Sequence, residues 1–122
     1  MDEGLVYWIK AQIDSASDEI CAFCFNLYEE RTGFSLEVVG SKIFLIDDPD
    51  WACREDFVPS ARHRWKIPQS MSGPDWESCL EAVKQNIQQL LEKKKIAKFE
   101  SAEAVAVGFV NGDLQVLKPQ NI

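Results

Sequence analysis

Residues 72–95 read SGPDWESCLEAVKQNIQQLLEKKK, and the segments on either side are best understood as the packing partners of this sequence. Its apolar residues recur three or four positions apart, a spacing that places them on one face of an α-helix: Trp76, Leu80, Val83, Ile87, Leu90 and Leu91. Pro74 suits the first helical position, and Asp75 and Glu77 suit the positive end of the helix dipole. The sequence therefore predicts a long helix over about 74–95 with a buried apolar stripe.

The flanking segments have the alternating pattern of β-strands. Residues 20–28 are apolar on both faces, which indicates an interior strand, and residues 34–38 alternate as a half-buried strand does. We also predict strands over 42–46, 62–67, 105–109 and 114–118. Asn111-Gly112 predicts a hairpin with a type I′ turn between the last two strands, because that turn needs positive φ at both central residues.

These elements predict an α+β fold in a single domain, residues 1–122. Residues 2–16 carry an amphipathic pattern that predicts an N-terminal helix. Short links between strands favour antiparallel pairing. We therefore expect one antiparallel sheet of five or six strands, with the N-terminal helix and the long helix packed on it.

The charge balance excludes some partners. The chain has 20 acidic and 13 basic residues and a net charge of −7, so it would repel a phosphate backbone. This acidity suits a basic protein partner, although it also keeps a small protein soluble. No apolar run approaches the roughly 18 residues of a membrane span, and Asp2 and Glu3 have the wrong sign for a signal peptide. We expect a cytoplasmic protein that binds neither membrane nor nucleic acid, with its four cysteines as free thiols.

No pattern in the chain predicts a catalytic, cofactor or metal site. Cys21 and Cys24 have the spacing of a zinc or redox pair, but they lie in a predicted strand, where residues three apart face opposite sides. The acidic cluster that starts at Asp47 lacks the glycine of a calcium loop. His63 is the only histidine, and no nucleophile motif accompanies it. We predict no cofactor, no metal and no catalytic residue.

The irregular segment after residue 46 is the candidate binding surface. It mixes aromatic and charged side chains, as protein interfaces do, and long irregular segments in small domains are often functional. The alternative is that Trp51, Phe57 and Trp65 only close the core. The predicted partner-binding residues are Asp47, Asp48, Asp50, Trp51, Arg54, Glu55, Asp56 and Trp65.

Three segments together resemble a known group of proteins: AFCFNLYE at 22–29, DWACRE at 50–55 and VGFVNGD at 107–113. They resemble small, acidic, bacterial cytoplasmic proteins of the immunity type, encoded beside polymorphic or contact-dependent toxins. The resemblance implies a non-enzymatic protein that neutralises its cognate toxin domain by forming a heterodimer with it. A basic target such as a nuclease domain would suit the charge of this chain and would associate quickly.

Two other functions stay open at this level. One is an acidic secretion-type chaperone, which would form a homodimer and hold an effector segment along a sheet edge. The other is a small enzyme that uses His63 together with an acidic residue. The sequence leaves open whether the protein forms a homodimer.

Overall fold

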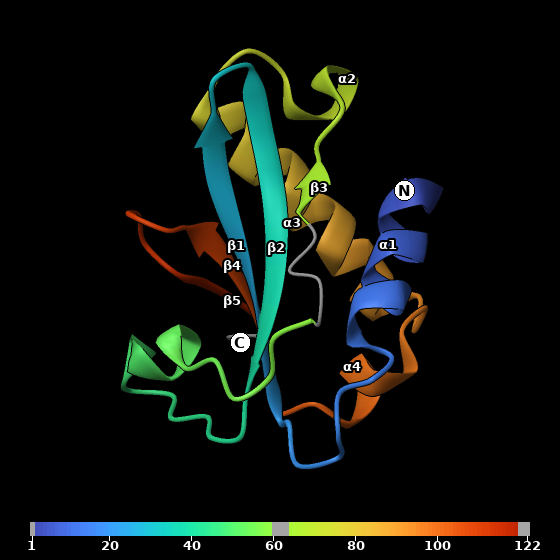
Figure 1. Ribbon diagram of the computed structural model, residues 1–122, viewed down its shortest axis with the longest axis vertical. Helices are drawn as coiled ribbons and strands as arrows, with labels where there is room; N and C mark the ends of the chain where they lie inside the picture. The colour runs from blue at the N-terminus through green and yellow to red at the C-terminus, as the bar shows by residue number, and fades with distance from the viewer. Residues whose placement is uncertain (1, 60–63, 120–122) are drawn as a thin grey trace.

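The long helix α3 (Trp76–Glu92) packs on one face of a five-stranded sheet in the computed structural model, which describes residues 2–59 and 64–119 (Figure 1). The strand order is β3-β2-β1-β4-β5, with bounds β1 (Ala22–Glu30), β2 (Gly33–Ser41), β3 (Trp65–Lys66), β4 (Ala104–Phe109) and β5 (Gln115–Lys118). The other helices are α1 (Glu3–Ile13), α2 (Gln69–Ser72), α4 (Ala97–Ser101) and the 3₁₀ helix η1 (Pro49–Cys53). The predicted α+β class, with an N-terminal helix and one long helix, is confirmed.

The sheet is mixed, so the prediction of an entirely antiparallel sheet is wrong for one pair of strands. β1 and β4 run parallel, from Ala22 opposite Ala104 to Leu27 opposite Phe109, whereas the other neighbours are antiparallel. The tight hairpin to β2 occupies one side of β1. The chain then reaches the other side of β1 only after passing through α3, and a crossover of this length permits parallel pairing.

Both ends of α3 are defined by hydrogen bonds, and they make the helix shorter than predicted. Asp75 is the N-cap and forms a capping box with Ser78, so Pro74 precedes the helix and does not occupy its first position. At the other end, Lys94 has a φ of 53°, and the N–H of Lys95 donates to the carbonyl of Leu90 at 3.0 Å. This is the Schellman arrangement, here with lysine where glycine is usual.

The apolar stripe of α3 is buried against the sheet, with one exception. Cys79, Val83, Ile87 and Leu90 are buried, and Leu80 and Leu91 pack against them. Trp76 was predicted to belong to this stripe, but it is 52% exposed. Trp76 is the first residue of the helix, and its ring stands at 90° to that of Phe109.

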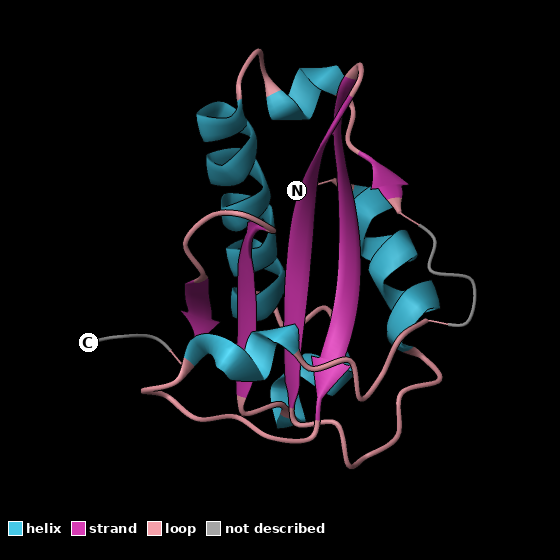
Figure 2. Ribbon diagram, turned by 60° about the vertical axis from the view of Figure 1, so that its left-hand side comes forward, coloured by secondary structure: helices cyan, strands magenta, loops and turns pink. Residues whose placement is uncertain are grey.

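The two faces of the sheet carry cores of different size. The larger core lies under α1, α3 and α4, where Phe99 contacts Phe23 and Phe25 with ring centroids 5.3 and 5.9 Å apart. The opposite face presents smaller side chains, including Ala22, Ala104 and Ala106. A loop covers one end of that face, and Figure 2 shows η1 lying across the strands there.

Three local predictions on the strands need correction. Residues 42–46 form no strand, because the chain leaves the sheet at Ser41, whose hydroxyl bonds both main-chain groups of Ile43. The strand predicted at 62–67 is reduced to β3, and its first two residues lie outside the described part of the chain. The β4–β5 hairpin exists, but neither Asn111 nor Gly112 has positive φ. Residues 110–114 form a longer loop, which does not need a type I′ turn.

Within the residues that the structure describes, no helix combines the length and the apolar composition needed to cross a membrane.

Candidate protein-binding surface

The segment between β2 and the short bridge at Phe57 is a loop on the face of the sheet that carries the smaller core. We call residues 42–56 the acidic loop, because it holds five acidic residues and two basic ones, a net charge of −3 (2 − 5). All seven charged residues are classed as exposed, although the Asp56 side chain itself is only 21% exposed: Lys42, Asp47, Asp48, Asp50, Arg54, Glu55 and Asp56. The loop therefore presents concentrated negative charge to solvent.

Trp51 anchors the acidic loop to the sheet. Its side chain is only 4% exposed and packs in the smaller core with Cys24, Val39 and the alanines of β1 and β4. Phe44 meets the Trp51 ring edge-on, with centroids 5.3 Å apart. Trp51 was predicted to contact a partner, but the structure places it in the core, and its neighbours at the surface are the residues available to a partner.

Two of the predicted acidic residues shape the loop. Asp48 caps η1 by accepting a hydrogen bond from the Asp50 N–H at 3.0 Å. Asp56 accepts from Arg54 at 2.8 and 3.2 Å and from the main-chain N–H of Lys42 at 2.9 Å. The Arg54 side chain, together with the Lys42 N–H, lowers the pKa of Asp56. Both carboxylates are thus already engaged in holding the loop together.

The carboxylates of Asp47 and Asp50 are exposed and form no hydrogen bond or ion pair with the described part of the chain. They lie next to a feature that the sequence did not reveal. Ile43, Leu45 and Ile46 are 42%, 53% and 68% exposed, although the pattern had placed them in a strand. Exposed aliphatic side chains beside unpaired charges are a typical composition for a protein interface. The signal available in the sequence was the apolar run 43–46 directly before Asp47 and Asp48.

Trp65 does not belong to the acidic loop. It lies on β3 opposite Leu36 and packs against the helix-side core, with its ring centroid 6.5 Å from that of Trp8. Trp51 and Trp65 therefore lie on opposite faces of the sheet. The predicted binding residues between 47 and 56 therefore lie together in the acidic loop, whereas Trp65 lies apart from them on the other face of the sheet.

The four cysteines are free thiols, and two of them, Cys24 and Cys79, are buried. Burial raises the pKa of Cys24 to about 12, and the nearby Cys53 adds to this effect. Burial also raises the pKa of Cys79 to about 11. Cys53, at the end of η1, is exposed. Across residues 2–59 and 64–119, no group of three His, Cys, Asp or Glu side chains is placed to hold a metal ion, and His63 lies outside these ranges.

Comparison of the chain with protein-family models, curated proteins and solved structures finds no match. The functional argument therefore rests on the composition and geometry of the acidic loop.

Proposed function

We propose that this protein is a non-enzymatic binding protein that neutralises a bacterial toxin domain by forming a stoichiometric complex with it. The acidic loop is the contact surface. The observation that carries the proposal is the exposure of Ile43, Leu45 and Ile46 beside the unpaired carboxylates of Asp47 and Asp50.

The two kinds of side chain contribute differently to binding. Burial of the exposed aliphatic side chains supplies free energy, at about 25 cal/mol per Å² of apolar surface. The carboxylates steer a basic surface towards the loop and raise the association rate constant. Because Trp51, Asp48 and Asp56 already hold the loop in one shape, little conformational entropy is lost on docking.

The charge indicates the kind of partner. The whole chain carries −7, and the acidic loop alone contributes −3 (2 − 5) from its own residues. A basic domain with an apolar patch, such as a nuclease domain, is complementary to this surface.

A charge-reversed loop tests the proposal. Asp47→Lys/Asp50→Lys reverses the two unpaired carboxylates and leaves the structural Asp48 and Asp56 in place. The control is Asp14→Lys/Glu92→Lys, which changes the net charge equally at exposed positions after α1 and at the end of α3. Each protein is tagged and incubated with an extract of the source organism, and the bound proteins are identified by mass spectrometry.

We expect the wild type and the control to retain one basic protein in equimolar amount, and the loop variant to lose it. Retention by all three proteins would contradict the role of the acidic loop. Recovery of many weakly bound proteins, or of an effector held unfolded by a homodimer, would contradict the neutralising function itself.

A further inference from the structure

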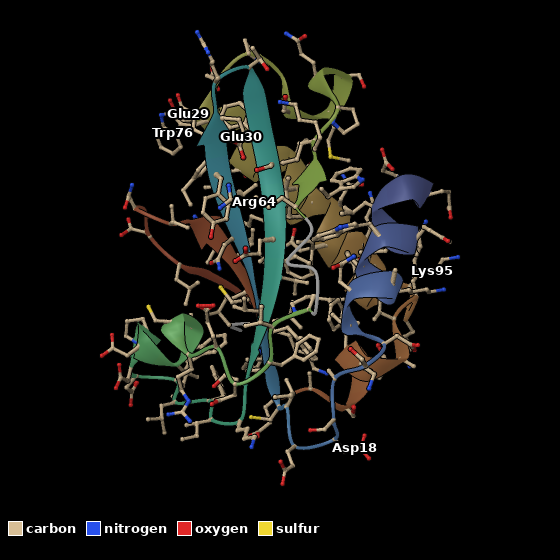
Figure 3. The ribbon with its side chains drawn as sticks, viewed as in Figure 1. Asp18, Glu29, Glu30, Arg64, Trp76 and Lys95 are labelled. Atoms are coloured by element: carbon tan, nitrogen blue, oxygen red, sulfur yellow. The ribbon has the colours of Figure 1, made fainter. Side chains whose placement is uncertain are left out.

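A cleft separates the start of α3 from the β4–β5 loop, away from the acidic loop. Its volume is about 660 Å³, and we call it the aromatic cleft. The side chains that matter for its chemistry are Tyr28, Glu29, Trp76, Phe109, Val110 and Asp113. Figure 3 shows Trp76 and Glu29 near the end of β1.

The unequal lengths of two strands create this cleft. β4 ends at Phe109, and the Val110 N–H makes the last bond to β1, at the Leu27 carbonyl, 3.2 Å away. β1 continues to Glu30, so its final residues have no strand beside them on the β4 side. Gly108 permits the loop to fold back here, because a Cβ at this position would lie 2.8 Å from the Asp113 carbonyl oxygen. Tyr28 and Glu29, which follow the last residue of β1 that is paired with β4, line the cleft on this side.

Trp76 forms an exposed aromatic wall. Its ring stands at 90° to that of Phe109, with centroids 6.2 Å apart, and its side chain is 52% exposed. Val110, on the facing loop, is 50% exposed. About half of the Trp76 residue is thus open to the cleft and to solvent, where a ligand can reach its indole ring.

The electrostatics of the cleft favour a cation. Glu29 and Asp113 are the charged side chains among the described lining residues, and both are exposed. The face of an indole also attracts cations. A cation–π contact of this kind already exists within the chain at Tyr28, next to Glu29, where the Arg64 guanidinium lies 3.6 Å from the centroid of the Tyr28 ring.

We propose that the aromatic cleft binds an arginine side chain carried by an extended segment of a partner protein. The guanidinium stacks on Trp76 and is neutralised by Glu29 and Asp113, and the segment that carries it lies beside the end of β1. Arginine is favoured over lysine because its planar group both stacks on aromatic rings and pairs with carboxylates. The proposal goes beyond the proposed function, since the cleft shares no residue with the acidic loop.

A titration monitored by NMR tests the proposal without knowledge of the partner. The probe is the capped peptide Gly-Val-Arg-Val-Gly, and the control peptide carries citrulline, a neutral isostere, in place of arginine. Trp76→Leu and Glu29→Gln/Asp113→Asn are the test variants, and their thermal unfolding is compared with that of the wild type. Asp14→Asn/Glu92→Gln, which removes two charges at exposed positions outside the cleft, is the matched variant.

We expect the arginine peptide to shift the indole N–H signal of Trp76 and the amide signals of Glu29 and Gly112. The citrulline peptide should bind the wild type about tenfold more weakly, and both cleft variants should bind the arginine peptide about tenfold more weakly, whereas Asp14→Asn/Glu92→Gln should bind it like the wild type. Equal binding of the two peptides, unchanged binding by folded Trp76→Leu, shifts confined to residues 42–56, or no binding at millimolar peptide would each overturn the proposal.

Discussion

Phe44 meets Trp51 edge-on, with ring centroids 5.3 Å apart, and this pair packs the acidic loop against the face of the sheet that carries the smaller core. The indole of Trp51 is buried among small side chains, whereas the apolar residues at 43, 45 and 46 remain exposed. Trp51 is therefore part of the core, whereas its aliphatic neighbours in the loop lie at the surface.

The free energy of unfolding should depend strongly on Trp51. Trp51→Ala removes a side chain that is 4% exposed, and we expect a loss of about 3–5 kcal/mol in urea denaturation. Trp76→Ala is the matched control, because that side chain is 52% exposed and should lose about 1 kcal/mol through its contact with Phe109. Equal losses in the two variants would show that Trp51 does not anchor the loop.

Three of the thiols, Cys24, Cys53 and Cys79, should differ in their reaction with iodoacetamide at pH 8. Cys53 is exposed and should be modified first in the native protein. Cys24 and Cys79 should stay unmodified until the protein is unfolded, because they are buried and their pKa values are raised to about 12 and about 11. Mass spectrometry of peptides over time gives the order, and early modification of Cys24 would contradict the packing of the loop on β1.

Asp75 should make stability depend on pH at the acidic end. The Ser78 main-chain N–H, together with its hydroxyl, lowers the pKa of Asp75. A carboxylate with a lowered pKa in the folded state contributes stability above its unfolded pKa, and the contribution is lost as the pH falls through the folded value. The difference in unfolding free energy between wild type and Asp75→Asn should therefore be full at pH 7 and shrink below the usual pKa range of aspartate.

Urea denaturation of both proteins from pH 7 to pH 2 measures this difference. A gap that stays constant or widens on acidification would show that the charge of Asp75 does not stabilise α3.

Sequence patterns predicted correctly those helices and strands that are determined by residues close together in the chain. The stripe of α3, its acidic start at Asp75 and the alternation in β1 and β2 all lie within short windows, and the structure has them. The parallel pairing of β1 with β4 depends on residues about eighty positions apart, so no window contains it. The burial of the two tryptophans could not be assigned either, because Trp51 and Trp76 both follow an aspartate, and only the fold places Trp51 inside and Trp76 at the surface.

Only part of the candidate site could be predicted, because the rest of it depends on contacts between distant segments of the chain. The acidic residues of the loop could be found from composition, whereas the exposure of Ile43, Leu45 and Ile46 depends on the chain leaving the sheet at Ser41. The separation of Trp65 from the loop depends on which face of the sheet each tryptophan occupies.

The most direct test of the central claim is the association rate constant with the isolated partner, measured for wild type, Asp47→Lys/Asp50→Lys and Asp14→Lys/Glu92→Lys at low and high salt. We predict that the loop variant associates at least about tenfold more slowly at low salt, that the control stays near the wild type, and that high salt narrows the difference. Equal slowing of both variants would mean that only net charge matters, and an unchanged rate and affinity in the loop variant would show that the partner binds elsewhere.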